Sequence, residues 1–221
     1  MYPNIQVYQV TPLAIALLLA SCGAALIDWW AVLRSNKSVE YVAKPGVLIL
    51  LIGVALTLDP SYSSMRYWFV AALVLSLIGD IFLMLPSDRF VPGLSAFLLA
   101  HVAYSVGFLI RSPGSPAPII TTLLVVIFSA ISWRRLAAGM KSGGQSAYLP
   151  PVTAYVVVIG VMGAAALASG NLVAVAGALL FVLSDSIIGE TRFVGERSWG
   201  PIAVITTYHL GQALLVLSLV S

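Results

Sequence analysis

Residues 67–86 read YWFVAALVLSLIGDIFLMLP, and this stretch decides the class of fold to expect. At 1.5 Å per residue, about 20 apolar residues form a helix long enough to cross the hydrocarbon core of a bilayer. Asp80 is the one charged residue in the stretch, and a charge at that depth costs at least about 3 kcal/mol on insertion scales. The stretch therefore predicts a transmembrane helix whose aspartate has a specific purpose.

The same apolar pattern recurs along the whole chain. Seven further runs cover residues 11–33, 45–58, 92–110, 117–133, 149–169, 171–189 and 200–220. The run 45–58 is long enough to cross a membrane only if it begins near Tyr41. Hydrophobic residues make up 60% of the 221 and charged residues 9%, too few charges to cover the surface of a soluble protein, which usually has about 25%. We predict an all-α polytopic membrane protein, a bundle of eight transmembrane helices that forms one domain over residues 1–221.

The residues before the first apolar run and the single cysteine restrict the class of protein further. Residues 1–10 lack a basic region and a cleavage site, so the first helix is expected to remain as an anchor. Cys22 is the only cysteine, which excludes a disulfide framework and a multi-cysteine metal site. We expect no cofactor. A metal site formed by His101, His209, Asp80 and Asp185 is conceivable but lacks a tight spacing motif, so any metal and the oligomeric state stay open.

Basic residues are distributed unequally between the two sets of loops. Only Arg66 and Arg111 lie beside the even-numbered connections. The other nine lie in or beside the loops after the first, third, fifth and seventh helices: Arg34, Lys37, Lys44, Arg89, Arg134, Arg135, Lys141, Arg192 and Arg197. Because positive loops stay in the cytoplasm, both termini are expected outside, and the net charge of +3 reflects topology rather than binding to nucleic acid.

Another aspartate, Asp185, has surroundings like those of Asp80. It lies in GALLFVLSDSIIG at residues 177–189, and both aspartates fall near the C-terminal ends of their predicted helices. The offset of 105 residues between them also carries Lys44-Pro45 onto Leu149-Pro150. This spacing favours a 4+4 parallel internal repeat of two four-helix halves, as some transporters have.

Polar side chains from six predicted helices fall in the same, cytoplasmic half of the membrane. His101 and Tyr104 share one helix face, and so do Tyr208 and Gln212. We predict that one cavity, open to the cytoplasm or the inner leaflet, is lined by Lys44, Asp80, His101, Tyr104, Tyr155, Ser184, Asp185, Tyr208 and Gln212.

Each of these residues also has a plain structural interpretation. An aspartate can serve only as a bridge between helices, His101 and the tyrosines can pack, and Lys44 can reach toward the loop edge. Asp28 is expected to be solvated near the cytoplasmic loop, and His209 to pack or face headgroups. The remaining charged cluster is expected on a solvated face and consists of Glu190, Arg192, Glu196 and Arg197.

Two carboxyl groups in an apolar pocket suit two kinds of chemistry. They can donate and accept protons in acid-catalysed cleavage through an oxocarbenium ion, as paired carboxylates do in glycoside hydrolysis. They equally suit proton-coupled transport of a small molecule. A structural or lipid-sensing scaffold without turnover is the third alternative. No phosphate-binding loop, zinc-protease motif or nucleophile elbow is present in the sequence.

Several short blocks occur in an order that resembles a known family. They are Lys44-Pro45, Gly79-Asp80-Ile-Phe-Leu-Met84, Ala100-His101-Val-Ala-Tyr104, Tyr155 with Met162, the block from Gly177 to Asp185, and Thr207-Tyr208 with Gln212. Together these blocks resemble the YhhN-type lysoplasmalogenase family over most of the chain. The family pattern has an aromatic residue at position 209, so His209 departs from that pattern.

The resemblance implies a membrane hydrolase that cleaves the vinyl ether bond of a lysoplasmalogen, a lysophospholipid substrate, in a bacterial inner (cytoplasmic) membrane. In that reaction either Asp80 or Asp185 would be the general acid, and the other, ionised, would stabilise the cation and deprotonate water, with His101 orienting one of them or a water molecule. Lys44 would hold the phosphate at the cytoplasmic mouth. The others expected to bind substrate are Tyr104, Tyr155, Ser184, Tyr208 and Gln212.

Overall fold

The protein is described by a computed structural model over residues 11–60, 62–111 and 119–221, with only the backbone described for residues 119–122. These residues form eight α-helices and no strand. The helices are α1 (Pro12–Leu33), α2 (Lys37–Thr57), α3 (Ser63–Met84), α4 (Phe90–Arg111), α5 (Ile119–Ser142), α6 (Leu149–Ala168), α7 (Leu172–Phe193) and α8 (Gly200–Leu217), with short 3₁₀ turns at Ser146–Tyr148 and Ser218–Val220. All eight α-helices are long and apolar enough to cross a membrane, which confirms the predicted class and helix number.

Polar residues at the helix starts explain several of the boundaries. The side chain of Thr11 accepts a hydrogen bond from the backbone of Ala14 at 3.0 Å and begins α1. The side chain of Asn171 accepts from the backbone amides of Val173 and Ala174 and begins α7. Such caps satisfy amides that have no partner within the helix.

The second and fifth helices differ most from the predicted ranges. An Asn36 cap starts α2 at Lys37, well before residue 45, so Pro45 lies inside the helix. The fifth helix continues to Ser142 rather than ending at 133, because the polar residues after Trp133 extend it past its apolar part. As a result, Lys44 lies about 10 Å from the start of α2 instead of in its first turn.

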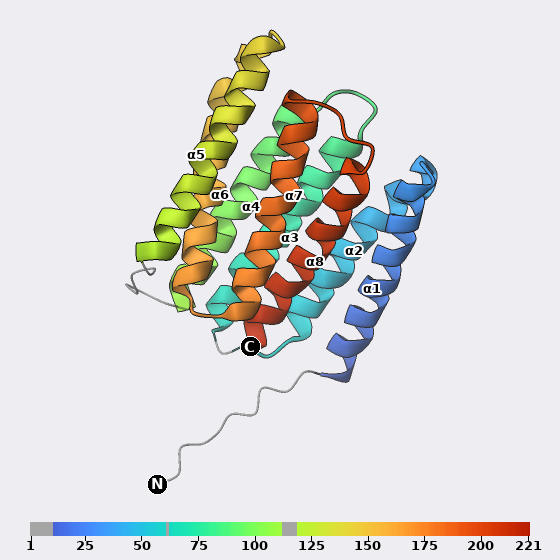
Figure 1. The fold of residues 1–221 in the computed structure, drawn as a ribbon. Coiled ribbons are helices and arrows are strands. Elements are labelled where there is room, and N and C mark those ends of the chain that lie inside the picture. Colours follow the sequence, from blue (N-terminus) through green and yellow to red (C-terminus); the bar gives the residue numbers. More distant parts are fainter. Residues whose placement is uncertain (1–10, 61, 112–118) are drawn as a thin grey trace.

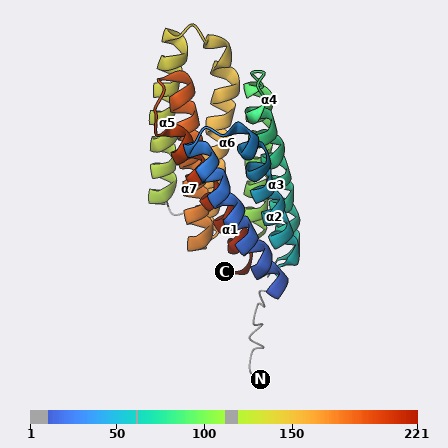
Figure 2. The same ribbon diagram turned by 90° about the vertical axis from the view of Figure 1, so that its right-hand side faces the viewer.

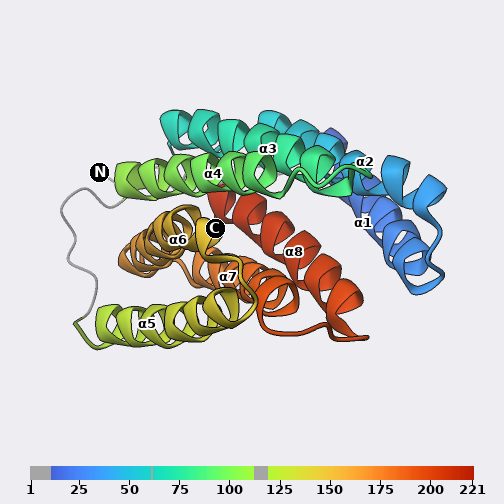
Figure 3. The ribbon, with the colours of Figure 1, turned by 90° about the horizontal axis from the view of Figure 1, so that it is seen from above.

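The helices form two layers with one helix between them. Seen from above, α1 to α4 make one row, α5, α6 and α7 lie on the other side, and α8 crosses between the two (Figure 3). α8 contacts α1, α2, α3 and α7, while α4 contacts α6. The helices run roughly along one direction (Figure 2). We call the end that holds the loops after α1, α3, α5 and α7 the basic end; it is the upper end in Figure 1.

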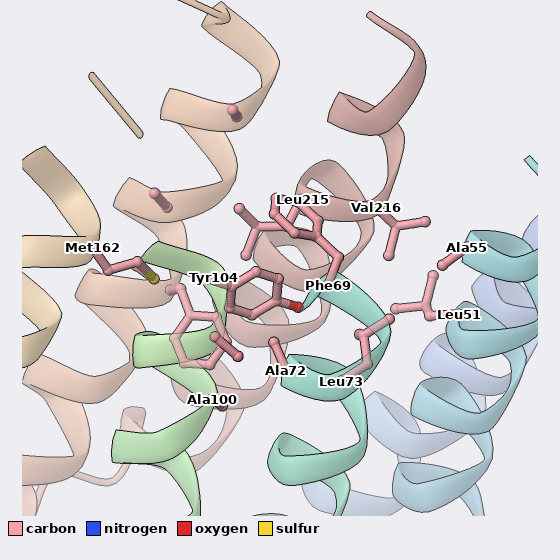
Figure 4. Packing of buried hydrophobic residues seen from close by; sticks show 14 of the residues in the cluster. Leu51, Ala55, Phe69, Ala72, Leu73, Ala100, Tyr104, Met162, Leu215 and Val216 are labelled. Atoms are coloured by element: carbon pink, nitrogen blue, oxygen red, sulfur yellow. The ribbon is translucent and has the colours of Figure 1, made fainter. Parts of the chain in front are cut away.

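Aromatic and small side chains fill the space between the layers. Tyr104 of α4 is fully buried and meets Phe69 of α3 edge to face, with ring centroids 4.9 Å apart. Figure 4 shows Tyr104 surrounded by side chains of α3, α6 and α8, among them Met162 and Leu215. This core fixes the relative positions of the helices that carry the predicted site residues.

Close contact between α7 and α8 requires a glycine. A Cβ atom at Gly177 would lie 2.9 Å from the backbone nitrogen of Leu215 and 3.0 Å from the carbonyl oxygen of Gly211. Both neighbours are backbone atoms, so they cannot rotate away as a side chain does. Gly177 therefore sets how near α8 approaches the helix that carries Asp185.

Candidate functional site

Asp80 forms a buried ion pair with Lys44 and a hydrogen bond with Tyr208, and these three residues come from three helices. The Nζ atom of Lys44 on α2 is 2.9 Å from Asp80 Oδ1, and the hydroxyl of Tyr208 on α8 donates to Asp80 Oδ2 at 2.7 Å. The side chain of Asp80 is 2% exposed and that of Lys44 is 13% exposed. Lys44 thus faces a carboxylate inside the bundle, not the mouth where a phosphate ligand was predicted.

Asp185 forms a second polar centre with residues of α4 and α6. The hydroxyl of Tyr155 donates to Asp185 Oδ2 at 2.5 Å, and Nε2 of His101 lies 3.0 Å from the same oxygen. His101 is fully buried, whereas 9% of the Asp185 side chain is exposed. Within the described residues no hydrogen bond reaches Asp185 Oδ1, which leaves that oxygen available to another molecule.

The surroundings of His101 restrict where its protons lie. Its Nδ1 atom is 3.2 Å from the sulfur of Met162, which can act only as a weak acceptor. A hydrogen bond there needs a proton on Nδ1, so Nε2 of the neutral ring can only accept. Nε2 lies 2.9 Å from the hydroxyl of Tyr155 and 3.0 Å from Asp185 Oδ2, so the imidazole, the phenol and the carboxyl group meet at one point.

The two aspartate centres are arranged alike. Asp80 on α3 takes one partner from α2 and one from α8, while Asp185 on α7 takes one from α6 and one from α4. Each aspartate thus pairs with the preceding helix and with the last helix of the other half. A 4+4 repeat predicts this exchange of partners, and the repeat itself stays a prediction.

The remaining predicted residues form other contacts between helices. Tyr104 donates a hydrogen bond to Oε1 of Gln212 at 2.5 Å and so joins α4 to α8. Ser184 donates to the backbone carbonyl of Val204 at 3.1 Å and joins α7 to α8. These three side chains connect helices instead of lining one shared cavity with the aspartates.

An aromatic layer separates the two centres. The ring of Phe181 lies 4.7 Å from that of His101 and 5.3 Å from that of Tyr208, measured between centroids. Phe97 packs beside it, 6.2 Å from Phe181 and 5.9 Å from Tyr208. The prediction of one cavity lined by all the polar residues is therefore wrong, because large aromatic side chains occupy the space between them.

A groove of about 860 Å³ reaches only the Asp185 centre. α4, α5, α6 and α7 form most of its lining, which includes Asp185 and Tyr155 but neither Asp80 nor Lys44. Most of the lining is apolar, and some of it, such as Phe128 and Leu179, is exposed on the outer surface of the bundle. The groove thus connects a buried carboxyl group with a surface that faces lipid in a membrane.

Charged residues line the groove at the basic end. Arg135 of α5 donates hydrogen bonds to both carboxylate oxygens of Glu190 on α7, at 2.8 Å to Oε1 and 3.0 Å to Oε2. Nη2 of Arg197 lies 3.5 Å from the same Oε2 atom. All three line the groove, although Glu190 and Arg197 were expected on a solvated face and Arg135 was regarded only as a topology signal. Glu190 and Arg197 were grouped in one charged cluster from the sequence, but nothing in the sequence indicated that Arg135 of α5 meets them.

Asp88 and Arg192 form a separate ion pair next to this cluster. Nη2 of Arg192 is 2.5 Å from Asp88 Oδ2, and its guanidinium lies over the ring of Phe90 at 4.9 Å. Asp88 is in the loop between α3 and α4, where the hydrogen bond from Arg192 lowers the pKa of its carboxyl group. Arg192 is thereby occupied by protein groups.

Asp28 was misjudged from the sequence, whereas His209 packs inside the bundle, which is one of the two outcomes expected for it. Asp28 is fully buried instead of solvated, and neither of its oxygens has a hydrogen-bond partner in the described residues. Its Oδ2 lies 3.9 Å from Nε2 of His209, whose Nδ1 accepts a hydrogen bond from Trp29 at 3.1 Å. Among the described residues no group of three His, Cys, Asp or Glu side chains is close enough to hold a metal ion.

The helices and the site together define a polytopic membrane protein with a buried carboxyl centre at the side of a lipid-sized groove. Residues 39–219 match the YhhN family, and the chain belongs to that family. The resemblance seen in the sequence is thus confirmed. No solved structure shows a significant match.

Several curated relatives carry enzyme names. The chain is 34% identical over 159 residues to the lysoplasmalogenase TMEM86A of Bos taurus, covering 67% of this chain and 63% of the relative. It is 34% identical over 149 residues to the human lysoplasmalogenase TMEM86B, covering 66% and 61%. A lysoplasmalogenase of Mycobacterium tuberculosis is 34% identical over 155 residues, covering 68% and 59%. The matched part thus spans about 60% of the length of these relatives.

Proposed function

We propose that this protein hydrolyses the vinyl ether bond of a lysoplasmalogen and releases a fatty aldehyde and a glycerophospho-alcohol. The observation that carries the proposal is the apolar groove of about 860 Å³ with one buried carboxyl group, Asp185, in its wall. An alkenyl chain fits such a lining, and a carboxyl group supplies the proton that this bond needs for cleavage. The names of the lysoplasmalogenase relatives support the same reaction.

Asp185 is suited to be the general acid. Cleavage begins when a proton is added to the alkene carbon that is not bonded to oxygen, which gives an oxocarbenium ion. Oδ1 of Asp185 has no partner in the described residues, while its Oδ2 accepts from Tyr155 at 2.5 Å and lies 3.0 Å from Nε2 of His101. A positioned acid of this kind typically contributes about 10²–10⁴-fold to the rate.

His101 and Tyr155 would support the steps that follow. Water adds to the oxocarbenium ion while Nε2 of His101 or the carboxylate of Asp185 accepts its proton. As the hemiacetal collapses, that proton passes to the ether oxygen, the bond between carbon and the ether oxygen breaks, and the hemiacetal hydroxyl gives its own proton to Asp185, which leaves aldehyde, alcohol and the restored acid. The hydroxyl of Tyr155 donates to Asp185 at 2.5 Å and stabilises the carboxylate whenever its proton has left.

Asp80 fits the second, charge-stabilising role. Its ion pair with Lys44 and its hydrogen bond from Tyr208 hold it in place, but it does not line the groove. Its influence on the oxocarbenium ion would therefore act across the ring of Phe181. We also propose that the basic end faces the cytoplasm, with both termini outside, on the excess of Lys and Arg in its loops.

The test is aldehyde release by the purified protein in detergent from a vinyl ether lysophospholipid, with the saturated alkyl ether as the control substrate. We expect release from the vinyl ether alone, a loss of about 10²–10⁴-fold in Asp185→Asn, and a smaller loss in Asp80→Asn. Asp28→Asn is the matched control, because Asp28 is another aspartate inside the bundle but does not line the groove.

Two results would contradict the proposal. Wild-type turnover in Asp185→Asn would remove the acid from the mechanism. No release by folded wild-type protein would instead favour proton-coupled transport, and uptake into proteoliposomes driven by a pH gradient would then be measured.

A further inference from the structure

We propose that Arg135 and Arg197 bind the phosphate of the substrate at the basic end of the groove, and that Glu190 binds the ammonium group of its headgroup. This inference rests on the proposed function, because it assigns the headgroup of the same lipid. It replaces Lys44 as the phosphate ligand. Lys44 is held by Asp80 at 2.9 Å and does not line the groove.

The two arginines are the only basic residues in the described lining of the groove. Arg135 uses Nε and Nη2 for its bonds to Glu190, and Arg197 approaches Glu190 through Nη2. A guanidinium group has five N–H donors, so each arginine keeps donors for a second anion. Their side chains are 57% and 39% exposed, so a ligand at the groove can reach them.

The spacing along α7 agrees with the length of a glycerophosphate. Glu190 follows Asp185 by five residues, which is about 7.5 Å along the helix. That rise is close to the span from a glycerol ether oxygen to its phosphate. A lipid with its vinyl ether at Asp185 would therefore bring its phosphate to the level of Arg135 and Arg197.

The groove continues past Asp185 in the other direction. On α6, Tyr155 contacts Asp185, and Leu167 lies twelve residues further on in the same lining, about 18 Å along the helix. This part of the lining is apolar and suits a long alkenyl chain. Trp199 lies at the charged end, with the guanidinium of Arg197 over its ring at 5.7 Å, as expected for a tryptophan at headgroup level. The groove thus has a charged end, a reactive middle and an apolar end, in the order of the substrate's own parts.

Three substrates separate the roles: an alkenylglycerophosphoethanolamine, an alkenylglycerophosphate without the amine, and an alkenylglycerol without the phosphate. In the double variant Arg135→Gln, Arg197→Gln we expect KM to rise at least about tenfold for the two substrates that carry a phosphate group. KM for the alkenylglycerol should stay unchanged. Glu190→Gln should raise KM about tenfold for the ethanolamine substrate only. Turnover number should change little, since these groups do not touch the reacting bond.

Arg134→Gln is the matched control, because Arg134 is the exposed neighbour of Arg135 and does not line the groove. Active variants whose KM values match wild type for all three substrates would overturn the headgroup assignment and leave the hydrolase proposal intact. If wild-type protein cleaves no vinyl ether, binding of the alkyl ether glycerophosphoethanolamine is measured by tryptophan fluorescence. Binding weakened about tenfold in the double variant would then support the headgroup site alone, and equal binding would overturn it.

Discussion

The ion pair between Lys44 and Asp80 offers a sharp test of how the bundle is held together. Lys44→Met keeps the length of the side chain but leaves the buried carboxyl group of Asp80 with only Tyr208 among its described partners. Removing one partner of a buried ion pair costs about 3–5 kcal/mol. Because the bond from Tyr208 remains and Lys44 is 13% exposed, we expect the lower end, about 3 kcal/mol. For a chain of this length, that is a fall of roughly 6–12 °C in the thermal midpoint.

The assay is thermal unfolding in detergent, followed by tryptophan fluorescence. The double variant Lys44→Met, Asp80→Asn removes both charges, so we expect it to recover at least half of the lost stability. A single variant Lys44→Met that unfolds at the wild-type temperature but binds the lysophospholipid more weakly would refute this reasoning. It would show that Lys44 serves the substrate, as the sequence first suggested.

Two further predictions concern other buried positions. Gly177→Ala should lower the thermal midpoint by the equivalent of about 1–3 kcal/mol, because its methyl group would meet backbone atoms of α8 at 2.9 and 3.0 Å. The control is Gly23→Ala, which should unfold like wild type because nothing lies within 4 Å of a Cβ atom at that position. Asp28→Asn should raise the midpoint, because burying an unpartnered carboxylate costs more than burying an amide. A lower midpoint in Asp28→Asn would mean that its oxygens have a bound partner such as water.

Helix number and type could be predicted from the sequence because they depend on local properties. A run of about 20 apolar residues has one stable form in lipid, a helix with its backbone groups bonded internally. The boundaries of α2 and α5 were less predictable. Asn36 caps α2 eight residues ahead of Lys44, so the helix begins earlier than predicted and Lys44 lies in its interior.

The partners of the site residues could be predicted only in part. Asp80, Asp185 and His101 were recognised because polar groups in an apolar helix need partners. That Phe97 and Phe181 would divide them into two centres was not visible, because both look like ordinary apolar residues in sequence. Arg135, Glu190 and Arg197 looked like loop charges for the opposite reason, since charge at a helix end is normally solvated.

The sequence by itself therefore determined the membrane class, the eight helices and the presence of Asp80 and Asp185 inside apolar helices. These follow from composition and periodicity, which act within single helices, and the order of the motif blocks indicated the family. Only the tertiary structure decided that Lys44 belongs to Asp80, that His101 and Tyr155 belong to Asp185, and that the groove reaches one aspartate and not the other. Those facts depend on which helix faces pack together, and packing is set by contacts between residues far apart in the chain, such as Gly177 against Gly211.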